Sequence, residues 1–247
     1  MRSWRACVLK AARSAAGRRA LLALLAFGSA TRAAAEVHAT VAIASDDRFR
    51  GRSVSQGRPV ASVDLAYDAA DGAYVGFAAS GVVSRHDGAQ FLSAQEYAGY
   101  VTRLPAGPRL DVGVTHLNYT EYYSGDETTQ YTELYAGLIT DRFTTRLYYS
   151  PDYFGRRNST LYGEIETAVR PARNLRLTAH AGMLAYLTGS RPEGRKSSEY
   201  DWRVGLTTLV RGFEVELAWS GAGPDRDYYA GAPRSRSGVA VALRRSF

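Results

Sequence analysis

Cysteine, histidine and long apolar runs are all scarce in this sequence, and each scarcity excludes a class of protein. The one cysteine, Cys7, lies near the N-terminus, so the rest of the chain offers no disulfide framework, thiolate metal site or cysteine nucleophile. None of the four histidines belongs to a helical His-x-x-x-His pair, and no glycine-rich phosphate loop joins a strand to a helix. After residue 35, no apolar stretch approaches the roughly 20 residues of a membrane-spanning helix. We therefore expect no metal site, no cofactor and no transmembrane helix.

The first 35 residues have the pattern of a secretory signal peptide. Residues 1–19 carry six basic side chains and no acidic one, and residues 20–30 form an apolar stretch of eleven residues. Three alanines at 33–35 then supply the small residues of a cleavage site. The apolar stretch is too short for a membrane anchor. We predict cleavage after Ala35, which divides the chain into a signal peptide at 1–35 and one domain at 36–247.

Removal of this signal changes the charge of the protein. The whole chain has 31 Lys and Arg against 24 Asp and Glu, a formal charge of +7. Seven of the basic residues and none of the acidic ones lie in 1–35, which leaves 24 of each sign in 36–247. The basic character therefore belongs to the export signal, and it gives no reason to expect nucleic acid as a partner.

From residue 36 onward the sequence predicts strands and turns, with no helical segment. Apolar and polar side chains alternate with the period of two that a strand requires. In 213–220, for example, the apolar side chains from Phe213 to Trp219 share one face, and Glu214 and Glu216 share the other. The candidate strands are 37–44, 60–67, 73–83, 91–101, 110–118, 131–139, 143–149, 161–169, 175–186, 200–209, 213–220 and 238–247.

The gaps between these twelve strands differ in length by parity. After the even-numbered strands they are short, as at 68–72, 140–142 and 210–212, and after the odd-numbered strands they are mostly longer, as at 45–59 and 221–237. Up-and-down outer-membrane barrels show this asymmetry, with short periplasmic turns and long external loops. The sequence therefore predicts an all-β fold, a transmembrane antiparallel up-and-down β-barrel of about twelve strands with both termini on the periplasmic side.

The last strand carries features of its own. Val239, Val241, Leu243 and Phe247 lie on one of its faces, and an apolar strand that ends the chain needs a neighbour to cover its edge. Closure of a barrel, in which this strand meets the first one, would provide that neighbour. A terminal Phe after alternating apolar residues resembles the assembly signal of bacterial outer-membrane barrels, although Arg245 replaces a usual apolar residue. We therefore expect the barrel-assembly machinery and outer-membrane lipid as partners.

The segment before the second strand resembles a known family. Residues 45–56 contain Arg-Phe-Arg-Gly and then Ser-Gln, followed by Pro59 and an alternating strand that ends at Tyr67. These residues, together with 73–80 and 198–205, resemble the TorF-type porin family of Gram-negative bacteria. Asp47 and extra residues between Gly51 and Gln56 depart from the pattern of that family. The resemblance implies an outer-membrane β-barrel of porin type, with no established substrate and no catalytic residue.

The polar faces of the strands predict a charged lumen. A charge that faced lipid at the membrane midplane would cost about 2–4 kcal/mol for Arg or Lys, so these side chains should face inward. The expected pore-lining residues are Asp64, Asp111, Glu133, Arg146, Glu164, Glu166, Arg176, Asp201, Arg203, Glu214, Glu216 and Arg244. Their excess of acids favours a cation-preferring channel for passive diffusion of small solutes. Alternatively, the acids and arginines pair across the lumen into a network that fills it.

Tyrosines and histidines have simpler expected roles. Many tyrosines lie near predicted strand ends, among them Tyr74 and Tyr148, where an amphipathic ring suits the membrane interface. Alternatively, they are the tyrosines that any β-sheet and its turns contain. The histidines are expected at strand ends or in loops.

Three rival functions remain open. A barrel enzyme would need a catalytic set, for which His180 with Ser220 and Glu216 is an example, but chance supplies such sets readily. A structural or adhesive barrel would use the loops at 119–130 and 221–237, which could bind a ligand or fold inward. A soluble periplasmic β-protein would show the same alternation. Nothing in the sequence argues for a particular oligomeric state.

Overall fold

The computed structural model describes residues 35–84, 88–120, 129–155, 157–188, 197–224, 228–229, 232–233 and 237–247. Residues 1–34 of the predicted signal peptide at 1–35 lie outside the described residues, and so do large parts of the loops at 119–130 and 221–237. The predicted cleavage and the expected roles of those two loops therefore stay predictions.

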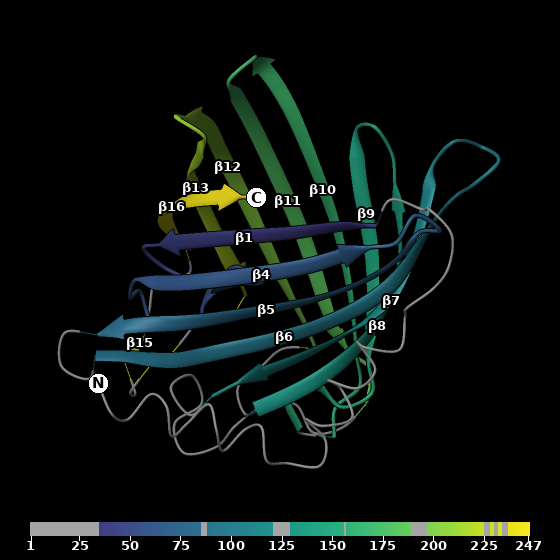
Figure 1. Cartoon of the computed structure of the whole chain (residues 1–247). Coiled ribbons are helices and arrows are strands. Elements are labelled where there is room, and N and C mark those ends of the chain that lie inside the picture. Colours follow the sequence, from purple (N-terminus) through teal and green to yellow (C-terminus); the bar gives the residue numbers. More distant parts are fainter. Residues whose placement is uncertain are drawn as a thin grey trace, which may run out of the picture. The chain divides into compact units, whose positions relative to one another are not determined.

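Twelve antiparallel strands close into one barrel, in which each strand pairs with its neighbours in the chain (Figure 1). The prediction of a twelve-stranded up-and-down barrel is confirmed. The strands are β1 (Glu36–Ala44), β4 (Val60–Asp68), β5 (Ala73–Ser84), β6 (Gly88–Arg103), β7 (Arg109–Tyr119), β8 (Thr129–Ile139), β9 (Phe143–Ser150), β10 (Thr160–Ala172), β11 (Leu175–Tyr186), β12 (Ser198–Val210), β13 (Phe213–Gly223) and β16 (Ser237–Ser246).

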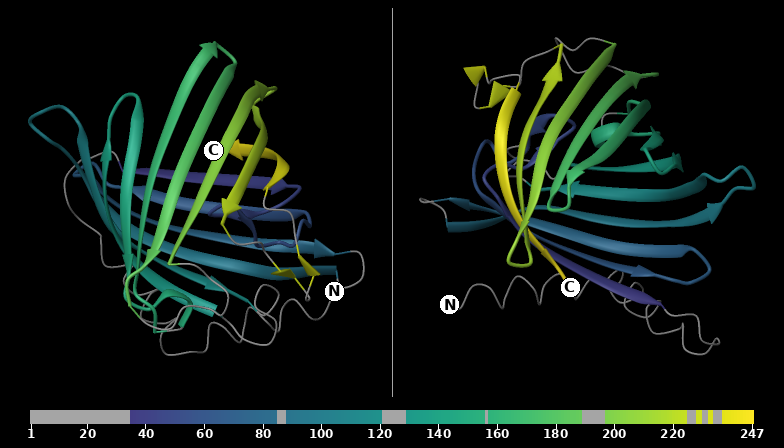
Figure 2. Two further views of the ribbon diagram at one scale, coloured as in Figure 1. Left: turned by 180° about the vertical axis from the view of Figure 1, so that it is seen from behind. Right: turned by 90° about the horizontal axis from the view of Figure 1, so that it is seen from above.

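Pairing of the first and last strands closes the barrel, as predicted. β1 and β16 run antiparallel with Ile43 opposite Leu243, and they lie side by side in Figure 2. The backbones of Ala39 and Phe247 exchange hydrogen bonds at 2.9 and 3.4 Å. The exposed edge that a terminal apolar strand would present is thereby removed.

The two faces of the wall differ in chemistry. Large apolar side chains on the outer face are well exposed, such as Val37 at 71%, Ile165 at 47% and Val239 at 61%. Residues that alternate with them face inward and are mostly polar. An apolar exterior around a polar interior is the arrangement of transmembrane β-barrels. Among the described residues, no helix is long and apolar enough to cross a membrane, and the only helical turn is η1 (Tyr153–Gly155).

Connections at one end of the barrel are short, and most of those at the other end are long. β10 and β11 are joined through residues 173–174 and β12 and β13 through 211–212, whereas residues 45–59 separate β1 from β4. The connection between β5 and β6 is an exception at the long-loop end, because both strands extend further than predicted and leave only residues 85–87 between them.

On the inner face of the barrel wall, several tyrosine rings lie directly over glycines of a neighbouring strand. Tyr135 on β8 is opposite Gly113 on β7, and a Cβ built on Gly113 would lie 2.5 Å from the Tyr135 hydroxyl. Tyr74 and Gly99 form a second such pair between β5 and β6. Since a ring can lie flat against the wall only where the opposite residue has no side chain, these glycines fix the orientation of inward tyrosines.

Candidate functional site

A short hairpin between β1 and β4 folds into the barrel from the long-loop end. It consists of β2 (Arg48–Phe49) and β3 (Arg52–Ser53), and its three arginines reach three different strands of the wall. Arg48 Nε donates to Ser220 Oγ on β13 at 2.9 Å, and Arg52 Nη2 donates to Glu199 on β12 at 2.9 Å. Arg50 reaches Glu133 on β8. The hairpin is therefore anchored on opposite sides of the lumen.

One carboxylate organises the hairpin internally. Asp46 accepts hydrogen bonds from the hydroxyls of Ser53 at 2.5 Å and Ser55 at 2.8 Å, and from the backbone N–H of Gly57 at 3.2 Å. Its other oxygen pairs with Arg48 at 3.0 Å. The turn at Arg50 and Gly51 uses positive φ angles of 46° and 73°, of which only the second is easy for its residue type. The hairpin thus carries much of its own hydrogen-bonding framework.

The acidity of Asp47, the residue next to Asp46, is changed by its surroundings in the hairpin. Burial, together with the charge of Asp46, raises the pKa of Asp47 from 3.8 to about 6. Its backbone N–H donates to Ser55 Oγ at 3.0 Å, and its carbonyl accepts from the N–H of Val54 at 2.8 Å. The Asp47 side chain is therefore a titratable group in the part of the hairpin that lies within the barrel.

Arg50 occupies the most enclosed position of the hairpin. Its Nη2 donates to both carboxylate oxygens of Glu133 at 2.8 and 2.9 Å, and its Nη1 donates to Tyr153 Oη at 3.1 Å. The guanidinium lies 3.8 Å from the centroid of the Tyr162 ring, a cation–π distance. Burial opposes the positive charge, but the interactions with Tyr153 and Glu133 outweigh it and raise the pKa of Arg50. Arg50 is therefore a permanent cation inside the barrel.

Apolar packing accompanies these polar anchors. A buried cluster at the long-loop end includes Val54 of the hairpin together with Leu92, Leu117 and Tyr131 of the wall, and Phe49 packs against it. The hairpin and the η1 turn therefore fill much of this half of the lumen.

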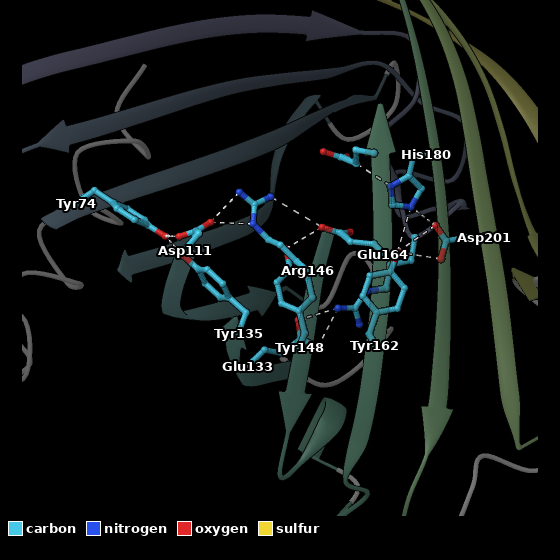
Figure 3. Close-up of polar contacts among 12 residues, drawn as sticks. Tyr74, Asp111, Glu133, Tyr135, Arg146, Tyr148, Tyr162, Glu164, His180 and Asp201 are labelled. Carbon is cyan, nitrogen blue, oxygen red and sulfur yellow. Dashed lines mark hydrogen bonds and ion pairs between the residues drawn. The ribbon is translucent and has the colours of Figure 1, made fainter. Parts of the chain in front are cut away.

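A chain of polar contacts continues along the inner wall (Figure 3). Tyr74 donates to Asp111 at 2.5 Å and also contacts the hydroxyl of Tyr135. Arg146 bonds to Asp111 at 3.0 Å and pairs with Glu164 at 4.0 Å. Across several strands, the acids are thus partnered by an arginine and by tyrosine hydroxyls rather than left unpaired.

His180 forms a second group on β10 to β12. Its Nε2 lies 2.8 Å from Asp201 and its Nδ1 lies 3.5 Å from Glu166, while the Tyr162 hydroxyl contacts both Asp201 and Nε2 (Figure 3). Further round the wall, Glu216 is buried between two arginines. Arg203 donates to it at 2.5 Å, and Arg244 lies 2.7 Å away.

All twelve predicted lumen residues lie on the face opposite the exposed apolar side chains, and each has a polar partner. Beyond the contacts already described, Tyr97 donates to Asp64 at 3.3 Å, Tyr148 donates to Glu164 at 3.0 Å, and Arg176 pairs with Glu214 at 3.5 Å. The wall arginines therefore pair with acids of neighbouring or next-nearest strands, and a network of these pairs across the lumen stays a prediction. Whether these residues line an open pore remains a proposal.

The described residues line two cavities inside the barrel. One of about 500 Å³ lies at the long-loop end, beside the hairpin and Glu133. The other, of about 330 Å³, lies near the short turn at 140–142. Their linings share five residues of the consecutive strands β10, β11, β12, β13 and β16, which we call the junction cluster: Glu166, His180, Arg203, Glu216 and Arg244. The two cavities thus meet along one charged side of the barrel wall.

Two expectations were wrong. Tyr74 and Tyr148 face the lumen rather than the membrane interface, because their hydroxyls bind carboxylates there. His180 lies in the middle of β11 rather than at a strand end, where it bridges two acids. The example catalytic set is not assembled, since Ser220 binds Arg48 and Glu216 binds two arginines.

Sequence reasoning also missed the role of the hairpin. It treated 45–59 only as a long gap that carried a family motif. The signal was available in the alternation of Arg48, Arg50 and Arg52, three cations in a segment that also contains Asp46 and apolar residues. A solvated loop has little need of that combination, whereas a segment folded among carboxylates does.

No group of three His, Cys, Asp or Glu side chains in the described part of the chain could hold a metal ion. A search of curated proteins finds no match to this chain. Among solved structures, the NanC porin matches with a TM-score of 0.55 at 10% identity, covering 85% of this chain and 98% of its own.

Two further solved structures match with TM-scores below 0.5. The KdgM porin in complex with oligogalacturonate has a TM-score of 0.48 at 13% identity, with 87% of this chain and 99% of that one covered. An outer-membrane channel from Pseudomonas putida F1 has 0.47 at 13% identity, with 90% and 98% covered. At such identities the likeness to NanC shows the fold alone, which is that of an outer-membrane porin. The model of a family described as bacterial proteins of unknown function (Gcw_chp) matches residues 29–247, so the chain belongs to that family.

Proposed function

We propose that this protein is an outer-membrane channel for the passive diffusion of small solutes, with a lumen narrowed by the inward hairpin. The observation that carries the proposal is the pair of cavities inside the barrel whose linings share the junction cluster. We call the cavity at the long-loop end the outer cavity. A solute that crosses the barrel would pass from it, between these charged side chains, into the cavity at the short-turn end.

The charge of the lining favours cations. Seven carboxylates and four arginines line the outer cavity, a formal charge of −3 with His180 neutral. The cavity at the short-turn end is lined by four arginines and three carboxylates, a formal charge of +1. Since a ring of acids attracts cations and raises their local concentration, the outer cavity would act as the selective entrance.

The expected location and partners belong to the same proposal. A signal peptide at 1–35 would export the chain, and the barrel-assembly machinery would insert the domain at 36–247 into outer-membrane lipid. The C-terminal side chains proposed as the assembly signal support this, because Val239, Val241 and Phe247 are exposed on the outer face. We also propose a relationship to the TorF-type porins, and the Arg-Phe-Arg-Gly segment of the hairpin is the feature that supports it.

A closed barrel is the second candidate, because the hairpin and the buried cluster around Val54 fill much of the long-loop end. Such a barrel would serve a structural or adhesive role through its external loops.

Single-channel conductance of the purified protein in a planar bilayer separates the two candidates. Heat-modifiable gel migration first confirms that the barrel is folded. Reproducible current steps support the channel, whereas a folded barrel without steps refutes it and favours the closed barrel.

The reversal potential in a KCl gradient tests the selectivity. The double substitution Glu164→Gln with Glu166→Gln removes two acids from the outer cavity and should shift the reversal potential toward that of anions. Glu36→Gln is the control, because Glu36 is the exposed first residue of β1. An unchanged reversal potential in the double variant would exclude cation preference from these acids.

A further inference from the structure

The guanidinium of Arg50 lies in a pocket formed mainly by the barrel and the η1 turn, with the ring of Phe49 from the hairpin itself 4.9 Å away. We call this pocket the guanidinium box and define it by Glu133 on β8, Tyr148 on β9, Tyr153 in η1 and Tyr162 on β10. Glu133 binds one terminal nitrogen through both of its oxygens, and Tyr153 accepts from the other. The ring centroids of Tyr162, Tyr153 and Tyr148 lie 3.8, 5.6 and 5.8 Å from the guanidinium carbon.

This geometry suits a planar guanidinium better than an ammonium. A guanidinium can stack flat on a ring and at the same time donate in its own plane to a carboxylate and a hydroxyl. An ammonium is a compact, strongly hydrated charge and cannot do both. Glu133 is only 2% exposed, so without a cation the box would hold an unpaired buried charge.

The cation in the box is the Arg50 side chain, which the hairpin backbone attaches to the barrel, and the backbone conformation at Arg50 is unfavourable. Arg50 adopts a positive φ of 46°, which costs a non-glycine residue free energy in the docked hairpin. The internal hydrogen bonds of Asp46 with Ser53 and Ser55 would survive a movement of the whole hairpin. A side chain on a short tether competes at an effective concentration on the order of millimolar, which a free solute can match.

The box is also within reach of solutes. Arg50, Glu133, Tyr148 and Tyr162 all line the outer cavity, so a molecule in that cavity meets the box directly. We propose that the guanidinium box is a binding site for solutes that carry a guanidinium group, and that Arg50 occupies it in the absence of such a solute. The proposal deepens the proposed function and rests on it, because it names the class of cation that the channel would recognise and links its binding to release of the hairpin.

Isothermal titration calorimetry of the purified protein in detergent tests the box. Agmatine is the probe, and putrescine, which carries amines but no guanidinium at the same charge, is the control ligand. Arg50→Gly empties the box and suits the positive φ. This variant should bind agmatine at least about tenfold more tightly than the wild type, because the tethered competitor is gone. It should also prefer agmatine to putrescine, and adding Glu133→Gln should abolish the gain.

A matched control variant exists at the other end of the barrel. Arg211 lies in the exposed turn between β12 and β13 with a φ of 51°, so Arg211→Gly makes the same chemical change outside the lumen. Agmatine affinity equal in Arg50→Gly, Arg211→Gly and the wild type would overturn the proposal. Equal affinity of Arg50→Gly for agmatine and putrescine would overturn the proposal as well, since the site would then recognise positive charge and not the guanidinium group.

Arg50→Lys covers the case in which Arg50→Gly does not fold. Lysine keeps a charge beside Glu133 but is a weaker tethered competitor, so agmatine should bind more tightly than to the wild type. Unchanged affinity in this variant would refute the proposal. Calorimetry reports on the box whether or not the barrel conducts, so a failure here and the absence of channel activity remain distinguishable.

Discussion

Gly51→Ala should release the hairpin from the lumen. Gly51 lies at the hairpin turn with a φ of 73°, and a Cβ built there would clash with the carbonyl oxygen of Gly221 and lie 2.6 Å from its carbonyl carbon. Gly221 belongs to β13, which is paired on both sides in the closed wall. Since the wall resists displacement, the hairpin is the part that must move.

The magnitude follows from two separate costs. A non-glycine residue in the left-handed region costs roughly 1–2 kcal/mol. An overpacked contact adds about 1–3 kcal/mol. The contact alone therefore changes the ratio of docked to undocked hairpin by about 5-fold to about 150-fold. Gly57→Ala isolates this effect, because Gly57 has a φ of 71° in the same segment and a Cβ at that position would have nothing within 4 Å.

Single-channel conductance measures the outcome, with heat-modifiable migration as the check on folding. Gly51→Ala should give larger or more frequent open events than both the wild type and Gly57→Ala, because an undocked hairpin widens the lumen. Equal conductance in all three proteins would refute the reasoning that contact with Gly221 holds the lumen narrow.

Three other outcomes are expected. Gly113→Ala should lower the temperature of the heat-modifiable gel transition, because the new Cβ would lie 2.5 Å from both the Tyr135 hydroxyl and the Ala98 carbonyl oxygen, an overpacking cost of about 1–3 kcal/mol. Gly163→Ala, whose Cβ would lie 3.6 Å from its nearest neighbour, should change that temperature little, and equal shifts in the two variants would contradict this account of the close packing at Gly113. Because burial raises the pKa of Asp47 from 3.8 to about 6, the docked hairpin holds its proton more tightly, so docking weakens as pH rises from about 4 to about 6 and then levels off. Conductance should rise over that interval in the wild type, and an Asp47→Asn variant with the same pH profile would exclude Asp47 as the cause. Phe247→Ala should reduce the amount of folded protein in outer membranes, measured by fractionation and heat-modifiable migration, and an undiminished amount would remove Phe247 from the proposed assembly signal.

The lumen chemistry was partly accessible from sequence. The alternation placed Asp111, Glu133 and Glu216 on the inner face, because a period-2 pattern is local and needs no knowledge of distant residues. The same pattern could not settle the face of Tyr74, since a tyrosine suits both a membrane interface and a carboxylate-lined interior. The glycine opposite it in the wall, Gly99, decides the outcome.

By itself, the sequence determined the twelve strands, their inward and outward faces and the closure of the last strand on the first, since these follow from local periodicity and from the need to cover an edge. Tertiary structure alone decided that residues 45–59 turn into the barrel and which acid each arginine meets. Arg50 and Glu133 are 83 positions apart, and Arg48 and Ser220 are 172 apart. Such partners are brought together only by closure of the barrel, because no local pattern encodes which residues face each other across a lumen.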